Sequence, residues 1–297
     1  VLCARLGQLG PWLVIILCGG ASAFLNNTPI VVLAAPVVRD VATSLNLSPK
    51  RWNPQAVHGA ISSAKNQLVA PDAYVVPIGD PFARVVRDVY AAYEKALREQ
   101  NAFDFDDLLV KPVELFEANP DLLERYQERF AFILVDEYQD TNRAQFRFLE
   151  LLAARHRNIM VVGDDDQSIY GWRGADIRNI LGFEETYPGA AVVRLERNYR
   201  SSGNILAAAN EVIRRNLQRK SKTLRTDRDA GERIILVETA DERDEAGWIV
   251  EEIEARRSAD ATVAYQDFAI LYRTNAQSRA LEDAFRRRGV PYQIVGG

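Results

Sequence analysis

The sequence contains few of the residues on which several classes of protein chemistry depend. Only two cysteines and two histidines occur among its 297 residues. Both cysteines, Cys3 and Cys18, lie in an atypical first segment, so the sequence supports neither a disulfide framework nor a zinc site. His58 and His156 give little support to histidine-based catalysis. The default setting is therefore a reducing, cytoplasmic one.

An excess of positive charge is also missing. The net charge of −4 and the pI of about 5.5 argue against a uniformly basic coat for nucleic acid. The net charge does not exclude a local basic groove, because phosphate contacts need Arg and Lys only along the path of the nucleic-acid strand. The chain is 47% hydrophobic and 26% charged, as soluble globular proteins are. Its length accommodates about two domains.

Residues 1–38 form an apolar segment that does not fit the rest of the chain. As a signal peptide, the segment has an apolar core at 11–17 and a cleavage-like Ala21-Ser-Ala23, but only Arg5 precedes the core and the chain begins with valine. As a membrane span, it is interrupted by glycines and by Asn26-Asn27. A pair of ordinary buried strands is a third interpretation. We favour a fourth, a fragment whose first segment is damaged or replaced, and expect no stable membrane association.

Two short apolar runs in the middle of the chain end abruptly at acidic residues. The run 132–136 leads into Glu137, and the run 159–163 leads into three aspartates. Such runs are typical of parallel strands that are buried on both faces. Ligands of open α/β sheets bind at the carboxyl edge, where one carboxylate can hold Mg²⁺ and its neighbour can activate a water for attack on phosphorus. Asp136 and Glu137 suit these roles; the alternative is a solvated acidic turn.

Three long motifs follow one another in order: Asp136-Glu-Tyr-Gln-Asp-Thr-Asn142, Gly163 to Ala175, and Leu195-Glu-Arg-Asn-Tyr-Arg-Ser201. Through them, residues 39–297 resemble the UvrD/Rep-type superfamily 1 DNA helicases, and the first motif resembles their Walker B motif. The resemblance implies an α/β, RecA-like P-loop NTPase fold with parallel sheets flanked by helices. It also implies a helical insertion and an incomplete second RecA-like domain.

The expected domain organisation follows from this resemblance and from hydrophobic spacing. The domains are expected to be the apolar segment 1–38, a partial helical insertion at 39–80, a partial first RecA-like domain at 81–194, and a partial second one at 195–297. Helical spacing predicts helices at 60–68, 80–101, 143–155, 203–216, 242–255 and 276–287. Apolar runs predict further strands at 192–195, 233–237, 268–272 and 292–295.

The resemblance implies ATP and Mg²⁺ as cofactors, with five residues around them. Asp136 holds the metal, Glu137 activates the attacking water, and Gln167 bonds the γ-phosphate or that water. Tyr199 stacks on the adenine, and Arg200 reaches the γ-phosphate from the second motor domain. Arginine suits this last role because its planar, permanently charged fork bonds phosphate oxygens bidentately.

A second group of residues is predicted to contact DNA. Tyr170, Trp172 and Arg173 alternate aromatic and cationic groups, and Trp172 is flanked by Gly171 and Gly174. Stacking on an aromatic ring contributes roughly 1 to 3 kcal/mol per base and tolerates any base, which suits a motor on arbitrary sequence. Phe105 or Phe103 is a further candidate near the single strand, with core packing as the alternative.

Two basic features are interpreted more simply. Lys65 lies on a predicted helix, and we expect it to be solvated, with a phosphate contact as the alternative. The stretch from Arg214 to Arg228 carries seven basic residues and one acid, Asp227. We interpret it as a solvated connecting loop in preference to a DNA contact.

The resemblance implies an ATP-dependent 3′–5′ DNA helicase and DNA-stimulated ATPase of repair or replication. Its partners would be single-stranded and 3′-tailed duplex DNA. No Gly-x-x-x-x-Gly-Lys-Ser/Thr loop occurs in the sequence, so we expect this chain alone to be an inactive fragment.

The alternative is a non-catalytic DNA-binding or regulatory protein that keeps the helicase scaffold. Glu137 and Arg200 favour the enzyme, because a binding module needs no water-activating carboxylate. A third possibility is that the chain is the helicase portion of a helicase-nuclease.

Overall fold

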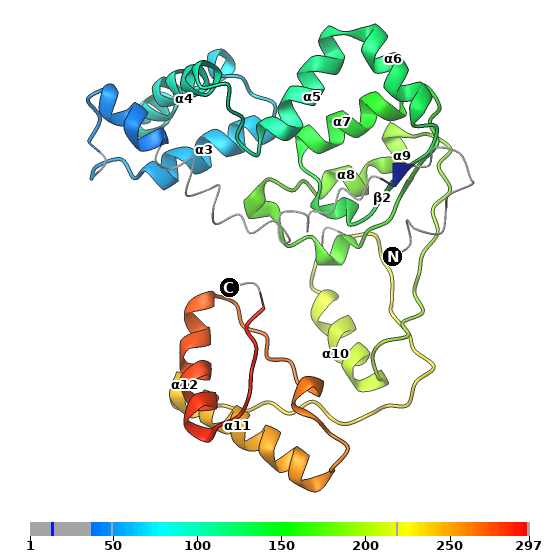
Figure 1. The fold of residues 1–297 in the computed structure, drawn as a ribbon. Helices are drawn as coiled ribbons and strands as arrows, with labels where there is room; N and C mark the ends of the chain where they lie inside the picture. The colour runs from blue at the N-terminus through cyan, green and yellow to red at the C-terminus, as the bar shows by residue number, and fades with distance from the viewer. Residues whose placement is uncertain (1–12, 15–36, 49, 218, 296–297) are drawn as a thin grey trace. The chain divides into compact units, whose positions relative to one another are not determined.

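The computed structural model describes residues 13–14, 37–48, 50–217 and 219–295 (Figure 1). The interpretations of the apolar first segment therefore fall largely outside the described residues. The chain divides into two compact units. The first comprises Val1–Asn198 with Ala209–Arg225, and the second comprises Tyr199–Ala208 with Thr226–Gly297. Among the described residues, no helix has both the length and the apolar character needed to cross a membrane.

A small parallel sheet lies in the first unit. Its three strands are β1 (Leu13–Val14), β2 (Ile133–Val135) and β3 (Ile159–Val161), in that spatial order. In the β2–β3 pair, Leu134 lies opposite Met160. The predicted strands at 132–136 and 159–163, and their parallel pairing, are confirmed. The prediction that both faces are buried is wrong, because Leu134 is 40% exposed and Met160 is 58% exposed.

The helical part that precedes this sheet packs around its own apolar core. It contains helical residues 37–44, α3 (Pro54–Asn66) and α4 (Pro81–Glu99). Proline at the first turn and a polar side chain before it start both long helices: Asn53 caps α3 and Asp80 caps α4. This is why α3 begins earlier than the apolar spacing predicted. Val38, Ile61, Val86 and Tyr93 are among the fully buried core residues of this part.

Helices cover the sheet in the rest of the first unit. These helices are α5 (Asp107–Ala118), α6 (Pro120–Arg129), α7 (Arg143–Ala153), α8 (Arg178–Leu181) and α9 (Phe183–Thr186). Helix α7 packs against both α5 and α6, as Figure 1 shows. A reciprocal capping box between Asn142 and Gln145 fixes the start of α7. Ile133, Val135 and Leu149 lie in the shared core.

Helices also dominate the second unit. Helix α10 (Gly203–Ile213) crosses the division between the units, whereas α11 (Glu242–Ala259) and α12 (Ser278–Arg288) pack on each other around Val250 and Phe285. Short 3₁₀ turns complete the described chain at Pro71–Ala73, Tyr138–Asp140, Asp165–Gln167, Gly171–Arg173, Tyr265–Asp267 and Asn275–Gln277.

The predicted strands of the C-terminal part are not formed among the described residues. Segments 192–195, 233–237, 268–272 and 292–295 have no ladder of hydrogen bonds to a neighbouring strand, and only a single bridge, Arg197 to Arg225, lies near them. Apolar alternation predicts a strand only where a partner satisfies its backbone groups. The observed fold is α/β, as predicted, but its described sheet is confined to the first unit.

Candidate functional site

The end of strand β2 places two exposed carboxylates side by side. The Asp136 Oδ1 accepts a hydrogen bond of 2.9 Å from the backbone N–H of Glu137. Glu137 has a left-handed backbone, with φ of 50° and ψ of 42°. That conformation is uncommon for a residue with a Cβ and is concentrated at functional sites. Four other described non-glycine residues also have a positive φ, and Glu137 is the one of the five that the sequence predicted for the site.

Gln139 connects this pair to the turn that follows β3. It is 1% exposed, and its Nε2 donates to Glu137 Oε2 at 2.8 Å. Its Oε1 accepts from the Asp164 backbone N–H at 2.9 Å. One buried amide thus orients the Glu137 carboxylate and fixes the neighbouring turn. Gln139 was not predicted as a site residue, although it lies inside the first motif.

Gly163 makes this connection possible. A Cβ at this position would lie 2.5 Å from Gln139 Oε1 and 2.8 Å from the Ile180 Cδ1. Such distances are shorter than real Cβ contacts. The glycine at the end of the β3 run is therefore required by the close approach of the Gln139 amide.

The turn 164–167 contains Gln167, the predicted phosphate sensor. Gln167 is exposed, and its Nε2 donates to Asp164 Oδ2 at 2.7 Å. Burial alone would raise the pKa of Asp164, but hydrogen bonds from Lys222 and Gln167 hold this pKa below its ordinary value. Asp164 is therefore a carboxylate at neutral pH, and it fixes the side-chain amide of Gln167.

Basic residues from far along the chain contact this turn. Lys222 Nζ contacts Asp164 and lies 2.8 Å from Asp165 Oδ1, while Arg219 forms two hydrogen bonds of 2.7 Å with Asp166. The side chains of Arg219 and Lys222 are only 13% and 15% exposed. The interpretation of 214–228 as a solvated loop is wrong for these residues. Sequence spacing holds no signal for a contact between positions so far apart.

The predicted DNA-contacting turn brings its aromatic and cationic side chains together. The Arg173 guanidinium lies 4.5 Å from the Trp172 ring centroid and 5.4 Å from that of Tyr170. Trp172 is 69% exposed, so its ring is not part of a core. Gly174 ends the turn with a φ of 87°, which favours glycine. An exposed indole beside a guanidinium can stack on a base while the cation meets a phosphate.

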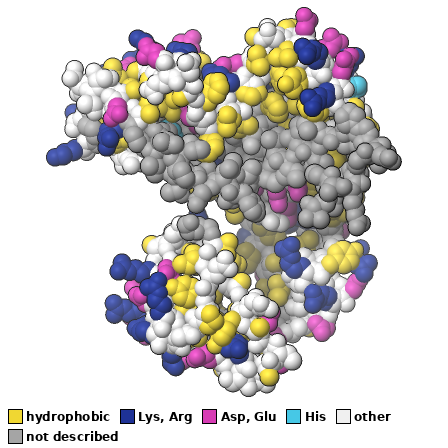
Figure 2. Space-filling model, in the orientation of Figure 1, with side chains coloured by type: hydrophobic (Ala, Val, Ile, Leu, Met, Phe, Trp, Pro, Cys, Tyr) yellow, Lys and Arg dark blue, Asp and Glu magenta, His cyan; other side chains and the backbone are white. Residues whose placement is uncertain are grey.

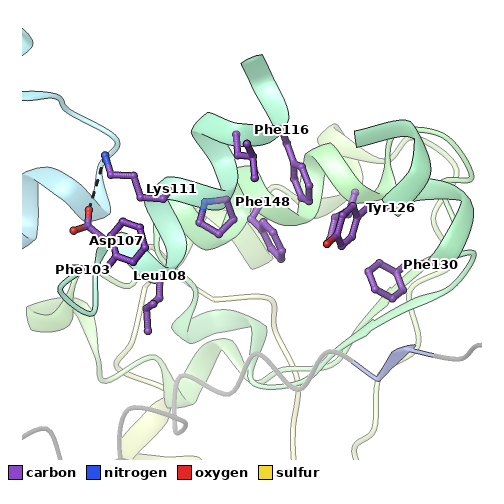
Figure 3. A pocket seen from close by; sticks show the side chains of 11 residues that line it. Phe103, Asp107, Leu108, Lys111, Phe116, Tyr126, Phe130 and Phe148 are labelled. Atoms are coloured by element: carbon purple, nitrogen blue, oxygen red, sulfur yellow. Dashed lines mark ion pairs between the residues drawn. The ribbon is translucent and has the colours of Figure 1, made fainter. Parts of the chain in front are cut away.

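The other predicted aromatic is placed differently. Phe105 is half-buried, whereas Phe103 is 69% exposed and lines a hollow of about 480 Å³. Figure 3 shows Phe103, Phe116 and Phe148 among the aromatic side chains around this hollow. Its lysine, Lys111, contacts Glu114 at 3.0 Å and lies 4.0 Å from both Glu94 and Asp107. The hollow contains none of the predicted catalytic residues.

Tyr199 and Arg200 belong to the second unit, whereas the other predicted site residues belong to the first. Both are exposed, and Tyr199 is 73% exposed. The Arg228 guanidinium donates to the Arg200 carbonyl at 2.7 Å and to the Tyr199 carbonyl at 3.5 Å. This contact holds the backbone of the third motif through its carbonyl groups.

Lys65 is neither solvated nor placed for a phosphate. Its side chain is 2% exposed, and its Nζ lies 2.8 Å from each of Glu94, Asp104 and Asp107. Burial alone would lower the pKa of Lys65, but the charge of Asp104 and the hydrogen bonds that Lys65 donates to all three carboxylates raise it above its ordinary value. Both interpretations drawn from the sequence are therefore wrong. The lysine neutralises a buried acidic cluster between α3, α4 and α5.

The residue after Lys65 connects the helical part to the first motif. Asn142 Nδ2 donates to Asn66 Oδ1 at 2.6 Å, and Asn66 Nδ2 donates to Asp106 Oδ1 at 2.9 Å. Asn142 also caps α7.

Within the described part of the chain, two carboxylate clusters have ligand spacing that a cation could use, at 94, 104 and 107 and at 164–166. Because lysines contact both clusters, Asp136 remains the predicted ligand for a metal.

Charges of both signs are interspersed over the described part of the face in Figure 2. This pattern agrees with the negative net charge and provides no extended basic coat on that face. A nucleic-acid contact there would depend on a local feature such as the turn of Trp172 and Arg173.

Comparison with known proteins gives two adjoining family matches. Residues 28–188 match the N-terminal domain of the UvrD/REP helicases, and residues 193–297 match the UvrD-like helicase C-terminal domain. The ATP-dependent DNA helicases PcrA of Staphylococcus epidermidis and Staphylococcus aureus are each 49% identical to this chain over 261 residues. That alignment covers 88% of this chain and 36% of each relative. The chain thus spans about a third of the length of these curated relatives.

Proposed function

Because the chain belongs to the UvrD/REP helicase family, we propose that it supplies part of an ATP-driven motor that moves along and unwinds DNA with 3′–5′ polarity. The Gln139 amide supports this proposal most directly. It links Glu137 to the turn of Gln167, which continues into the turn of Trp172. The residue that would activate the attacking water, Glu137, is therefore connected through Gln139 to the segment that contains the base-stacking residue, Trp172.

ATP and Mg²⁺ are the cofactors of this proposal. Asp136 fits the metal, because it is an exposed carboxylate at the carboxyl edge of a parallel sheet and Mg²⁺ prefers oxygen ligands. When bound, the metal supplies positive charge to the phosphate oxygens. Glu137, held by Gln139, accepts the proton of the attacking water. Gln167 orients that water or the γ-phosphate, Tyr199 stacks on the adenine, and Arg200 contacts the γ-phosphate.

Single-stranded DNA and 3′-tailed duplex DNA are the proposed partners, and the cytoplasm is the proposed location. Trp172 provides a stacking surface for bases, Tyr170 and Arg173 support it, and Phe105 is a further contact on the strand's path. Repair or replication of DNA is the process that needs such a motor. The domains of the proposal follow the expected boundaries at 38, 80 and 194.

Binding of fluorescein-labelled oligo(dT) to this chain, measured by anisotropy, tests the DNA contact. Trp172→Ala removes a stacking surface and is expected to weaken binding roughly 5- to 150-fold, as a loss of about 1 to 3 kcal/mol implies. Trp248→Ala is the matched control, because Trp248 lies on α11 and is 37% exposed. Equal affinities for the Trp172 variant and the wild type would contradict the base-stacking role.

A non-catalytic DNA-binding protein is the second candidate. The exposed Trp172 indole beside the Arg173 guanidinium supports it, because these groups can bind a strand without hydrolysis. Both candidates predict DNA binding through Trp172, whereas only the motor predicts a role for Glu137. Release of phosphate from ATP that DNA stimulates and Glu137→Gln abolishes would therefore favour the motor, whereas background release is expected of both candidates, because this chain contains no phosphate-loop lysine.

A further inference from the structure

Three consecutive aspartates in the first unit place like charges close together. Asp164, Asp165 and Asp166 place carboxylate oxygens within 4.8 Å of one another. Asp165 and Asp166 are each only 10% exposed at the side chain, and Asp164 is 25% exposed. Like charges at this spacing repel, and burial makes each charge more costly. The turn therefore needs positive groups to keep its shape.

These positive groups come from the segment 219–222. Arg219 forms a bidentate pair with Asp166, and Lys222 Nζ contacts Asp164 and Asp165. The backbone N–H of residue 220 donates to Asp165 Oδ2 at 2.5 Å. Such partly desolvated, bidentate pairs hold geometry more firmly than exposed pairs do. Each aspartate of the turn is thus contacted by this one segment.

The same contacts determine where Gln167 lies. The two oxygens of Asp164 have different partners. Oδ1 contacts Lys222 Nζ and accepts from the Asp166 backbone N–H at 3.0 Å, whereas Oδ2 accepts from Gln167 Nε2 at 2.7 Å. Lys222 therefore orients the carboxylate to which the Gln167 amide is bonded. Removing the ammonium would leave Asp164 Oδ1 with the Asp166 backbone N–H alone and would remove the cation that Asp164 and Asp165 share, so the carboxylate would be held less firmly.

We propose that Arg219 and Lys222 are positioning residues for Gln167, and that they act through the aspartate turn instead of through contact with nucleic acid. The significance for ATP hydrolysis rests on the proposed role of Gln167. The positioning itself does not rest on that role, so the two can fail separately. Arg219 and Lys222 lie in the part that matches the C-terminal helicase domain, whereas the turn lies in the N-terminal match. The contact is therefore a connection between the two family segments.

The side-chain amide signal of Gln167 in the ¹⁵N-labelled full chain tests the positioning. The signal is assigned by its loss in Gln167→Glu. We expect Lys222→Gln to shift it in the same direction as Asp164→Asn, whereas Lys222→Arg leaves it near the wild-type position. Lys220→Gln is the matched control, because the Lys220 ammonium contacts Glu184 outside the turn. An unchanged Gln167 signal in Lys222→Gln would overturn the proposal.

A DNA-binding measurement tests the competing explanation. We expect Arg219→Gln and Lys222→Gln to bind oligo(dT) within about twofold of the Lys220→Gln control, since a lost phosphate contact would show as a further loss of affinity. A tenfold weaker affinity specific to these two variants would overturn the proposal in favour of a DNA contact. If Lys222→Gln does not fold, Lys222→Arg decides: a Gln167 signal at the Asp164→Asn position would contradict positioning by this cation.

Discussion

At the scale of single residues, the buried cluster around Lys65 should be a major determinant of stability. Lys65→Met leaves Glu94, Asp104 and Asp107 buried without their shared cation. Breaking a buried pair in this way costs about 3 to 5 kcal/mol. We expect urea unfolding to show a loss of that size, whereas Lys95→Met, which removes an exposed lysine paired with Glu99, changes stability by less than about 1 kcal/mol. Equal effects of the two substitutions would contradict this role of the cluster.

Asp106 should make stability depend on pH. Burial, and next the charge of Asp104, raise its pKa to about 6, although hydrogen bonds from Ser62 and Asn66 oppose the rise. The folded state therefore holds the Asp106 proton more tightly than the unfolded chain does. The stabilisation that this bound proton gives the folded state is lost as pH rises from about 4 to about 6. Relative to Asp106→Asn, the wild type should lose roughly 1 to 2 kcal/mol over this interval.

Thermal or urea unfolding of both proteins at several pH values checks this prediction. The difference between wild type and Asp106→Asn is the informative quantity, because the other carboxylates titrate in both proteins. A difference that stays constant from pH 4 to pH 7 would exclude a raised pKa at Asp106. A difference that grows in the wild type's favour would mean that the pKa is lowered.

At the scale of elements, Gly163 links the end of β3 to the site. Gly163→Ala would place a Cβ 3.1 Å from the Tyr138 backbone nitrogen as well as against the Gln139 amide. We expect it to destabilise the protein by about 1 to 3 kcal/mol, as overpacking of a filled site does. Gly59→Ala on α3 meets nothing within 4 Å and should be stabilising by up to about 1 kcal/mol. Circular dichroism melts compare the two; a neutral Gly163→Ala would show that the amide can move aside.

Local patterns in the sequence predicted about half of the elements of the first unit. Strands β2 and β3 and the helices α4 and α7 follow from apolar spacing, which is a local signal, whereas α5, α6, α8 and α9 were not predicted. The C-terminal strands were not formed, because alternation at 233–237 and 268–272 does not specify a partner. Leu236 and Leu271, which lie in these two segments, are 96% and 94% exposed, as expected where no partner strand packs beside them.

The candidate site was predictable where a motif carries it and not where distant segments meet. Asp136, Glu137, Gln167 and Trp172 were identified from the motifs, whereas their roles stay predictions. Lys65 and Lys222 were misassigned, because a lysine on a polar helix or in a basic run is usually solvated. Only the fold places three carboxylates around each of them. Burial of charge is a property of tertiary contacts, and sequence spacing does not encode it.

At the scale of the whole molecule, the central question is whether this chain turns over ATP. Phosphoryl transfer depends on cations that stabilise charge on the phosphate oxygens, and loss of one such group commonly costs several kcal/mol of transition-state stabilisation. The sequence has no Gly-x-x-x-x-Gly-Lys-Ser/Thr loop, and in the described structure Lys65 and Lys222 are engaged with carboxylates. We therefore expect no phosphate release from Mg-ATP above that of Glu137→Gln, with or without single-stranded DNA.

Each outcome of that assay has a distinct meaning. Equal, background release by wild type and Glu137→Gln would agree with a motor segment that lacks one phosphate-binding cation. DNA binding that depends on Trp172 would then show that the nucleic-acid contact does not need hydrolysis. Release that DNA stimulates and Glu137→Gln abolishes would contradict the prediction, because it requires another cation to replace the lysine. Arg200, exposed in the second unit, would be the first residue to substitute in that case.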